Sequence, residues 1–168
     1  MSLGQRILAE FDHEAISTRK ALERLPDGHF DFKPHERSSS LAELAAHIAN
    51  IGHWGASTCT KSEIDLAATG ISVRPVPPTT AAEAVAAFDK NADAFRTALA
   101  QVTDVQMAEL WTLRMGDQVI FSQPRAGVLR GFVMSHMIHH RGQLSVYLRL
   151  LNVPVPSMYG PSADENIF

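Results

Sequence analysis

The chain has 168 residues, of which 45% are hydrophobic and 20% are charged. This composition is typical of a folded globular protein and excludes a disordered or fibrous chain. The length favours one domain over residues 1–168. Fifteen lysines and arginines against eighteen aspartates and glutamates give a formal net charge of -3. We expect no nucleic-acid partner, because no basic surplus is available to bind phosphates.

Cysteine content and hydrophobic runs indicate the compartment. Cys59 is the single cysteine, which excludes an internal disulfide and a cysteine-rich zinc site and favours a reducing compartment. No run of about 18 apolar residues occurs, so no membrane-spanning helix is expected. Arg6, Glu10 and Asp12 interrupt the apolar residues near the N-terminus, unlike a secretory signal peptide. We therefore expect a cytoplasmic protein without a membrane partner.

Two helices are predicted in the first half of the chain. Apolar residues recur at intervals of three and four over residues 3–25, and a Pro-Asp-Gly turn at 26–28 ends this helix. Residues 29–39 have no periodic pattern and form a connection. The spacing in Ser40–Glu43 is that of a capping box, which begins a second helix expected to reach about Leu66.

Two further helices are predicted in the second half. Three prolines make residues 70–78 an extended linker, and a second capping-box pattern begins a helix over 80–102. Short apolar runs at 111–113 and 118–121 flank a Gly-containing turn and predict a two-stranded excursion. A helical stripe then runs over 124–152. The expected fold class is all-α, a four-helix bundle with this short excursion.

Two histidines share one face of the predicted last helix. Successive residues of an α-helix are rotated by about 100°, so His136 and His140 project about 40° apart and one turn removed. Phe132 and Leu144 lie on the same stripe, which places both imidazoles toward the interior. A buried imidazole without a hydrogen bond costs about 1 to 3 kcal/mol, and a metal ion is one of the few groups that satisfies two at once.

A mononuclear metal site needs a third protein ligand, and His47 is the best candidate. It repeats at helical spacing with Leu44 and Ile51 on the second helix, so it is expected to point inward. His53 is about 240° round the helix axis and faces elsewhere, and His139 lies toward the edge of its stripe as a weaker candidate. His13 is a reserve ligand. The other two histidines, His29 and His35, are expected to be exposed.

Each of these histidines has a structural alternative, that of a core residue with its hydrogen bonds satisfied. If a metal binds, zinc, nickel, iron and copper all suit three imidazoles. Two other metal-site classes are disfavoured. A zincin needs Glu where this chain has Met137, and a di-iron carboxylate centre needs two Glu-x-x-His pairs, whereas Glu10–His13 is the one such pair found.

Cysteine and arginine chemistry offers weaker candidates. Cys59 has no identifiable base and is expected to be a small buried hydrophobe rather than a nucleophile. Arg141 is expected to be a solvated helix charge. Arg125 and Arg130 are candidates for binding an anionic ligand at the mouth of the bundle.

Three segments together resemble a known family. They are Leu-Ala-Ala-His-Ile at 44–48, Ser-His-Met-Ile-His-His-Arg-Gly-Gln-Leu at 135–144, and Leu-Arg-Leu-Leu-Asn-Val-Pro-Val-Pro at 148–156. In this combination the chain resembles the DinB-like (DinB/YfiT) family of bacterial four-helix proteins. The resemblance covers nearly the whole chain, and its most specific part is the His-x-x-x-His-Arg-Gly-Gln run.

The resemblance implies a fold, a ligand set and a chemistry. It implies an up-down-down-up bundle, a homodimer, and a divalent metal such as zinc or nickel held by His47, His136 and His140, which match the family's ligand positions. Characterised relatives include metal-dependent transferases and isomerases that use low-molecular-weight thiols such as bacillithiol or mycothiol. In such relatives the open metal position would bind the thiol and deprotonate it to a thiolate nucleophile.

Two functions of different class follow. The first is a metal-dependent hydrolase or transferase, most specifically a thiol S-transferase acting on a small-molecule substrate. The second is a non-catalytic, metal-stabilised helical bundle that serves as a stress-linked binding or interaction protein. An open pocket beside the metal would favour the first, and a closed coordination sphere or dry apolar packing would favour the second.

Overall fold

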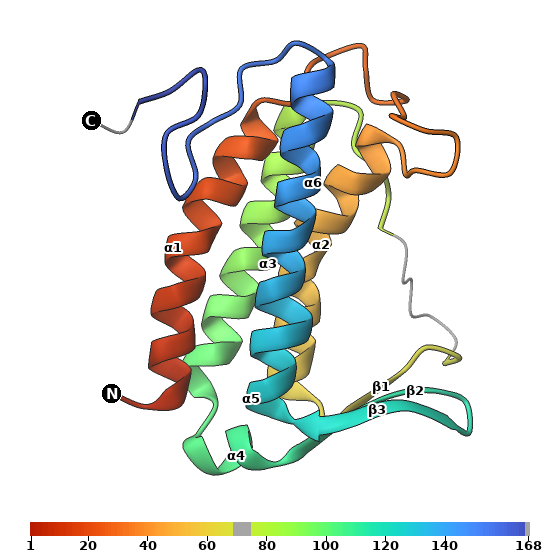
Figure 1. Ribbon diagram of the computed structural model, residues 1–168. Helices are drawn as coiled ribbons and strands as arrows, with labels where there is room; N and C mark the ends of the chain where they lie inside the picture. The colour runs from red at the N-terminus through yellow and green to blue at the C-terminus, as the bar shows by residue number, and fades with distance from the viewer. Residues whose placement is uncertain (69–74, 167–168) are drawn as a thin grey trace.

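The computed structural model describes residues 1–68 and 75–166. Long helices lie side by side along most of the molecule (Figure 1). They are α1 (Leu3–Glu23), α2 (Leu41–Thr60), α3 (Ala81–Gln101) and a last, unbroken helix made of α5 (Arg125–Val128), the π-helix η1 (Leu129–Ser135) and α6 (His136–Leu150). In Figure 1, α1 runs upward, α2 and α3 run down, and α6 runs upward again. Within the described residues, no helix is long and apolar enough to cross a membrane.

The start of α2 follows the predicted capping box. Ser40 Oγ accepts a hydrogen bond from the Glu43 amide at 3.1 Å, and the Ser40 amide donates to the Glu43 carboxylate at 2.7 Å. At α3 the capping box is incomplete. The Glu83 carboxylate accepts a hydrogen bond from the Thr79 amide at 2.7 Å. Thr80 Oγ1 still accepts from the Glu83 amide at 3.2 Å. Both helices therefore begin where their hydroxyl caps predict.

The predicted end of the second helix, at about Leu66, is wrong. α2 ends at Thr60, and Glu63–Asp65 form strand β1 instead. The physical reason is a residue distant in sequence, since the buried guanidinium of Arg125 donates to the Thr58 carbonyl, 67 residues earlier, and, at 2.6 Å, to the Lys61 carbonyl, 64 residues earlier. These bonds satisfy carbonyls that a continuing helix would have used.

A small three-stranded sheet lies beneath one end of the helices (Figure 1). β2 (Leu110–Met115) pairs antiparallel with β3 (Gln118–Pro124), which confirms the predicted excursion, and β1 adds a parallel third strand next to β2 that was not predicted. Gly116 has a φ of +58° at the turn, where a side chain would be strained, and its amide donates to Asp65 Oδ1 at 2.9 Å.

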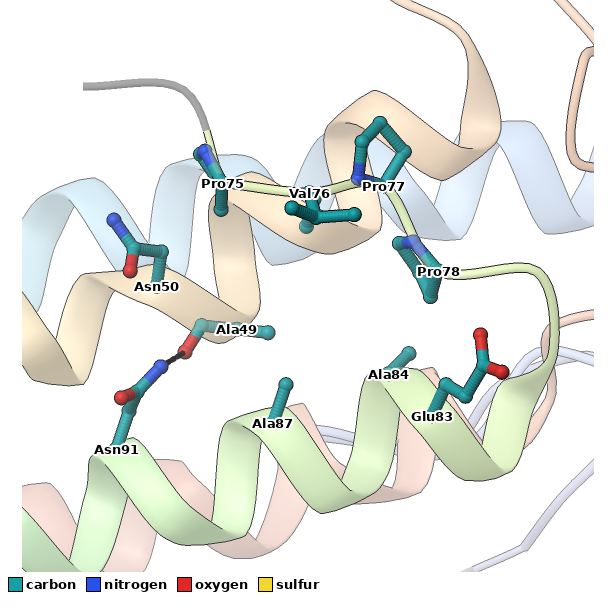
Figure 2. A pocket seen from close by; sticks show the side chains of 11 residues that line it. Ala49, Asn50, Pro75, Val76, Pro77, Pro78, Glu83, Ala84, Ala87 and Asn91 are labelled. Atoms are coloured by element: carbon teal, nitrogen blue, oxygen red, sulfur yellow. Dashed lines mark hydrogen bonds between the residues drawn. The ribbon is translucent and has the colours of Figure 1, made fainter. Parts of the chain in front are cut away.

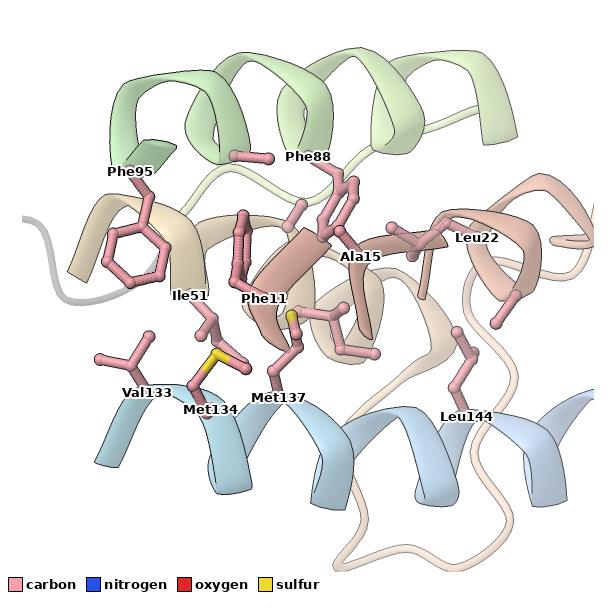
Figure 3. Close-up of a cluster of buried hydrophobic side chains, with 14 of the residues drawn as sticks. Phe11, Ala15, Leu22, Ile51, Phe88, Phe95, Val133, Met134, Met137 and Leu144 are labelled. Atoms are coloured by element: carbon pink, nitrogen blue, oxygen red, sulfur yellow. The ribbon is translucent and has the colours of Figure 1, made fainter. Parts of the chain in front are cut away.

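The main hydrophobic core lies between the long helices (Figure 3). Phe11 of α1 and Phe95 of α3 meet edge to face, with ring centroids 4.8 Å apart. α2 approaches α3 closely, because a Cβ at Gly52 would lie 2.7 Å from the Asn91 carbonyl oxygen and a Cβ at Gly55 would lie 2.7 Å from the Phe95 ring. The core therefore depends on glycines in α2 that lower its helix propensity by about 1 kcal/mol each.

Candidate metal centre

The fold brings together three histidines that are far apart in sequence. His47 lies on α2, and His136 and His140 lie one turn apart at the start of α6. Their ring centroids are 4.9 Å (His47 to His136), 4.4 Å (His47 to His140) and 4.5 Å (His136 to His140) apart. One ring nitrogen of each lies within 4.8 Å of the others. The helical spacing therefore predicted their convergence correctly.

The local backbone at this point is not the regular α-helix that was expected. The seven residues Leu129–Ser135, immediately before His136, form a π-helix, in which each turn is wider than an α-turn. π-Helical turns of this kind occur frequently at functional sites. Leu129, Val133 and Met134 are buried, so the wide turn still packs against the core while it leads into the two histidines of α6.

The environment keeps the three imidazoles neutral. Burial lowers the pKa of His47 and of His136, and it lowers the pKa of His140 to about 4. Neighbouring imidazoles contribute to each of these shifts, since two positive rings so close would repel each other. A neutral imidazole presents one nitrogen lone pair, which is the form that binds a metal ion.

Hydrogen bonds to the outer side of the rings orient two of the three histidines. His140 Nδ1 lies 2.7 Å from the side-chain oxygen Oε1 of Gln143. Because this oxygen only accepts, His140 Nδ1 carries the proton and Nε2 keeps its lone pair. A hydrogen bond from the His136 ring to the Phe132 carbonyl raises the pKa of His136 against the effect of burial. Such outer partners are typical of metal-binding histidines.

The donor set fits a divalent metal ion. Two nitrogens bound to one tetrahedral zinc at about 2.0–2.1 Å are about 3.3 Å apart, and the Nε2 atoms of His47 and His136 are separated by 3.1 Å. Among the described residues, these three histidines are the one group of three or more potential metal ligands that lie this close together. Three protein ligands leave a fourth position for water or a substrate.

The other five histidines lie outside this cluster. His53 is exposed on α2, as predicted, and His139 is exposed although its ring centroid is 4.9 Å from that of His140. The reserve ligand of the sequence prediction, His13, is also exposed and does not join the site. The two remaining side chains are exposed as predicted: His29 and His35.

The prediction that Arg141 is solvated is wrong. Its side chain is 1% exposed, and its guanidinium forms an ion pair with the Glu14 carboxylate at 2.7 Å. It also donates to the Glu14 carbonyl, to the hydroxyl of Thr18, and to the hydroxyl of Tyr159 at 2.7 Å. The Tyr159 hydroxyl in turn donates to the Glu14 carboxylate. The signal that sequence reasoning missed is Glu14 itself, an acidic residue on the inward face of α1.

The two arginines predicted to bind an anion are otherwise engaged. Arg125 is 5% exposed and directs its guanidinium at the main-chain carbonyls of Thr58 and Lys61 near the end of α2. Arg130 is exposed, and it forms an ion pair with Glu10 at 3.0 Å. None of these bonds directs Arg125 or Arg130 toward the histidine cluster.

Cys59 is buried, as predicted, with 8% of its surface exposed. Burial raises the pKa of its thiol to about 12, although the nearby charge of Arg125 acts in the opposite direction. At neutral pH the side chain is therefore a protonated thiol and not a nucleophile.

A cavity of roughly 240 Å³ lies elsewhere, between α2, α3 and the segment Pro75–Pro78 (Figure 2). Two of its polar side chains, Asn91 and Glu83, are engaged in hydrogen bonds of the fold. Asn91 donates to the Ala49 carbonyl at 2.8 Å, and the Glu83 carboxylate accepts from Thr79. In the part of the chain that the structure describes, the histidine cluster, and not this cavity, therefore holds the group of potential metal ligands.

The chain is similar to known proteins along its whole length. The DinB family model matches residues 1–166. The uncharacterized protein YrdA of Bacillus subtilis strain 168 is 30% identical over 160 residues, which cover 94% of this chain and 89% of that protein. The crystal structure of a DinB-like protein from Bacillus cereus ATCC 10987 has a TM-score of 0.67 at 24% identity, covering 91% of this chain and 95% of that one.

The fold is also similar to the crystal structure of YjoA, a DinB-like protein from Bacillus subtilis. This structure has a TM-score of 0.71 at 21% identity and covers 91% of this chain and 97% of the other. At these identities the two structures establish likeness of fold, while the family match over nearly all residues and the similarity to YrdA establish kinship. The chain therefore belongs to the DinB family.

Proposed function

We propose that this protein binds a divalent metal ion, zinc or nickel, through His47, His136 and His140, within an up-down-down-up four-helix bundle. We further propose that the site serves a metal-dependent transferase that uses a low-molecular-weight thiol and acts on a small molecule in the cytoplasm. One observation carries the proposal. Three neutral imidazoles from two helices converge, with one ring nitrogen of each within 4.8 Å of the others.

A divalent ion bound by three neutral ligands lowers the pKa of a thiol or water in its fourth position and so supplies a nucleophile at neutral pH. The chain's own residues would provide the orientation. Gln143 holds the proton of His140 on Nδ1, and the Phe132 carbonyl holds the ring of His136. With its pKa at about 12, Cys59 does not compete as a thiolate.

The non-catalytic alternative is supported by a separate observation. His47 on α2 and His136 on the last helix are 89 residues apart in sequence. A metal bound to both would therefore also stabilise the packing of these two helices. The two functions differ in what the fourth position does. A catalytic site exchanges an added ligand there, whereas a purely structural site has no use for one.

The first test is the metal content of protein purified without an affinity tag. We expect near-stoichiometric zinc or nickel in the wild type and its loss in the variants His47→Ala, His136→Ala and His140→Ala. His53→Ala is the matched control, because His53 is an exposed histidine on the same helix as His47. A wild type without metal, or retention of the metal in the three ligand variants, would contradict the proposal.

The second test separates catalysis from structure. Metal-loaded protein is screened for transfer of bacillithiol or mycothiol to small electrophiles, and we expect His140→Ala to abolish the transfer. Activity that survives the loss of metal would overturn the mechanism, and a metal-loaded protein that transfers no thiol would favour the non-catalytic bundle.

We also propose a homodimer, which sedimentation equilibrium would show as twice the mass of the chain.

A further inference from the structure

Three aromatic rings form a connected group next to the histidine cluster, in which Phe132 contacts the other two. Phe132 lies 5.6 Å from the ring of His136, measured between ring centroids. On its other sides, Phe132 lies 5.7 Å from Trp54 and 5.4 Å from Phe121. We call these three residues the aromatic shelf. It links a metal-ligand candidate to the small sheet through ring contacts alone.

Each ring of the shelf comes from a different element. Trp54 lies on α2, Phe121 on β3 and Phe132 in the π-helix η1. Beneath them is a second hydrophobic cluster of buried side chains from the sheet and the start of the last helix: Ile64, Trp111, Leu113 and Val128. The shelf is therefore supported from behind by packed side chains, which hold the three rings in a fixed arrangement.

The rings themselves are only half-buried, unlike the cluster on which they rest. Large aromatic side chains contribute most to stability when they are fully buried, so three adjoining rings that stay partly exposed offer apolar area for a ligand to cover. All three are uncharged, and Arg114 of β2, the strand next to β3, is paired with Glu63 and Asp65. The shelf therefore offers apolar contact and ring stacking rather than ionic attraction.

We propose that the aromatic shelf binds the flat, apolar part of a small molecule whose donor atom occupies the fourth position of the three-histidine site. The ligand class is a compound with an aromatic ring one or two carbons from a soft donor such as a thiol. This inference rests on the proposed metal site, and Phe132 joins the two, because its carbonyl bonds to His136 while its ring faces the other shelf residues.

The test uses Co²⁺-loaded protein and two probes, 2-phenylethanethiol and ethanethiol. Both place a thiolate on the cobalt, which its visible spectrum reports, and they differ by the phenyl group. We expect the wild type to bind 2-phenylethanethiol at least about tenfold more tightly, which is the order of magnitude of one stacked and partly buried ring. Phe132→Leu and Trp54→Leu should each reduce this ratio several-fold, since leucine keeps an apolar side chain but not the ring.

Phe32→Leu is the matched control. Phe32 is also half-buried and also contacts another aromatic ring, that of Tyr147, edge to face with centroids 6.1 Å apart, but it lies outside the shelf. Comparing the ratio of the two affinities between variants removes the difference in intrinsic donor strength of the thiols. The backbone carbonyl at position 132 is retained in Phe132→Leu, so the orientation of His136 is preserved.

The outcomes distinguish the inference from the proposed function. A reduced ratio in the two shelf variants and an unchanged ratio in Phe32→Leu would support the shelf. Stoichiometric Co²⁺ binding with equal affinity for the two thiols, or a preference that Phe132→Leu and Trp54→Leu leave intact, would overturn the shelf while leaving the metal site standing. Failure of the wild type to bind Co²⁺ at the histidines would overturn both.

Discussion

His140 and Arg141 are neighbours in sequence, yet they belong to two polar clusters of opposite kind, the first partly buried and the second buried. Arg141 meets groups that complement it, a carboxylate, a carbonyl and two hydroxyls, all supplied by the chain. His140 meets two groups of its own kind, and burial lowers the pKa of each ring in that cluster. A cluster of opposite charges is typical of structural stabilisation, whereas three neutral groups that are all potential metal ligands are typical of a site that binds something else.

The largest expected effect tests the structural cluster. Arg141→Met removes the cation and leaves the Glu14 carboxylate buried without its charged partner, so we expect the free energy of unfolding to fall by about 3 to 5 kcal/mol. Urea denaturation of the metal-free protein measures this change. Arg149→Met is the control, because Arg149 forms an exposed ion pair with Asp164 and should change stability far less. Equal stability of the two variants would contradict the comparison.

The second effect tests the histidine cluster. Metal at a free concentration of 100 times its Kd should stabilise the wild type by about 2.7 kcal/mol, because it binds the folded state alone. His140→Ala should remove this gain while changing the metal-free protein much less than Arg141→Met does. Thermal unfolding with and without zinc measures both quantities. Stabilisation of His140→Ala by zinc to the same extent would show that the metal binds elsewhere.

The third effect tests whether Gln143, the hydrogen-bond partner of His140, contributes to metal affinity. Gln143→Leu removes the oxygen that accepts from His140 Nδ1, and we expect metal affinity to fall by about 10- to 100-fold. Competition with a chelator of known affinity measures the change. Gln143→Glu, which restores an acceptor, should recover most of the loss, and Gln101→Leu on the exposed end of α3 should have no effect. If Gln143 only stabilised the helix, Gln143→Glu and Gln143→Leu would have equal metal affinity.

The smallest effect concerns Cys59. Its pKa is raised from an ordinary 9.0 to about 12, so the unfolded thiol ionises before the folded one and stability falls as the pH rises above 9. Below pH 9 this contribution is fully present. The folded protein should therefore react with a disulfide reagent at pH 8 far more slowly than the urea-unfolded protein, and Cys59→Ala should keep its metal. Fast reaction of the folded thiol would show that the buried environment opens.

The sequence determined those features that depend on local periodicity. The caps of α2 and α3, the turn at Gly116 and the inward positions of His47, His136 and His140 all follow from spacings within one helix or hairpin. Helical rotation is fixed by the backbone, so two histidines four residues apart lie on one face wherever the helix packs. The inward position of each candidate ligand was therefore accessible from the residues, whereas the meeting of His47 with His136 depends on how α2 packs against the last helix.

Only the tertiary structure decided where charges find partners and where helices end. Arg141 is buried because Glu14, 127 residues earlier, lies opposite it, and α2 stops at Thr60 where Arg125 takes up its carbonyls. Strand β1 exists because the β2–β3 hairpin offers it an edge, and the aromatic shelf exists because α2, β3 and η1 meet. These contacts join residues distant in sequence, and local spacing carries no information about which distant residues will meet.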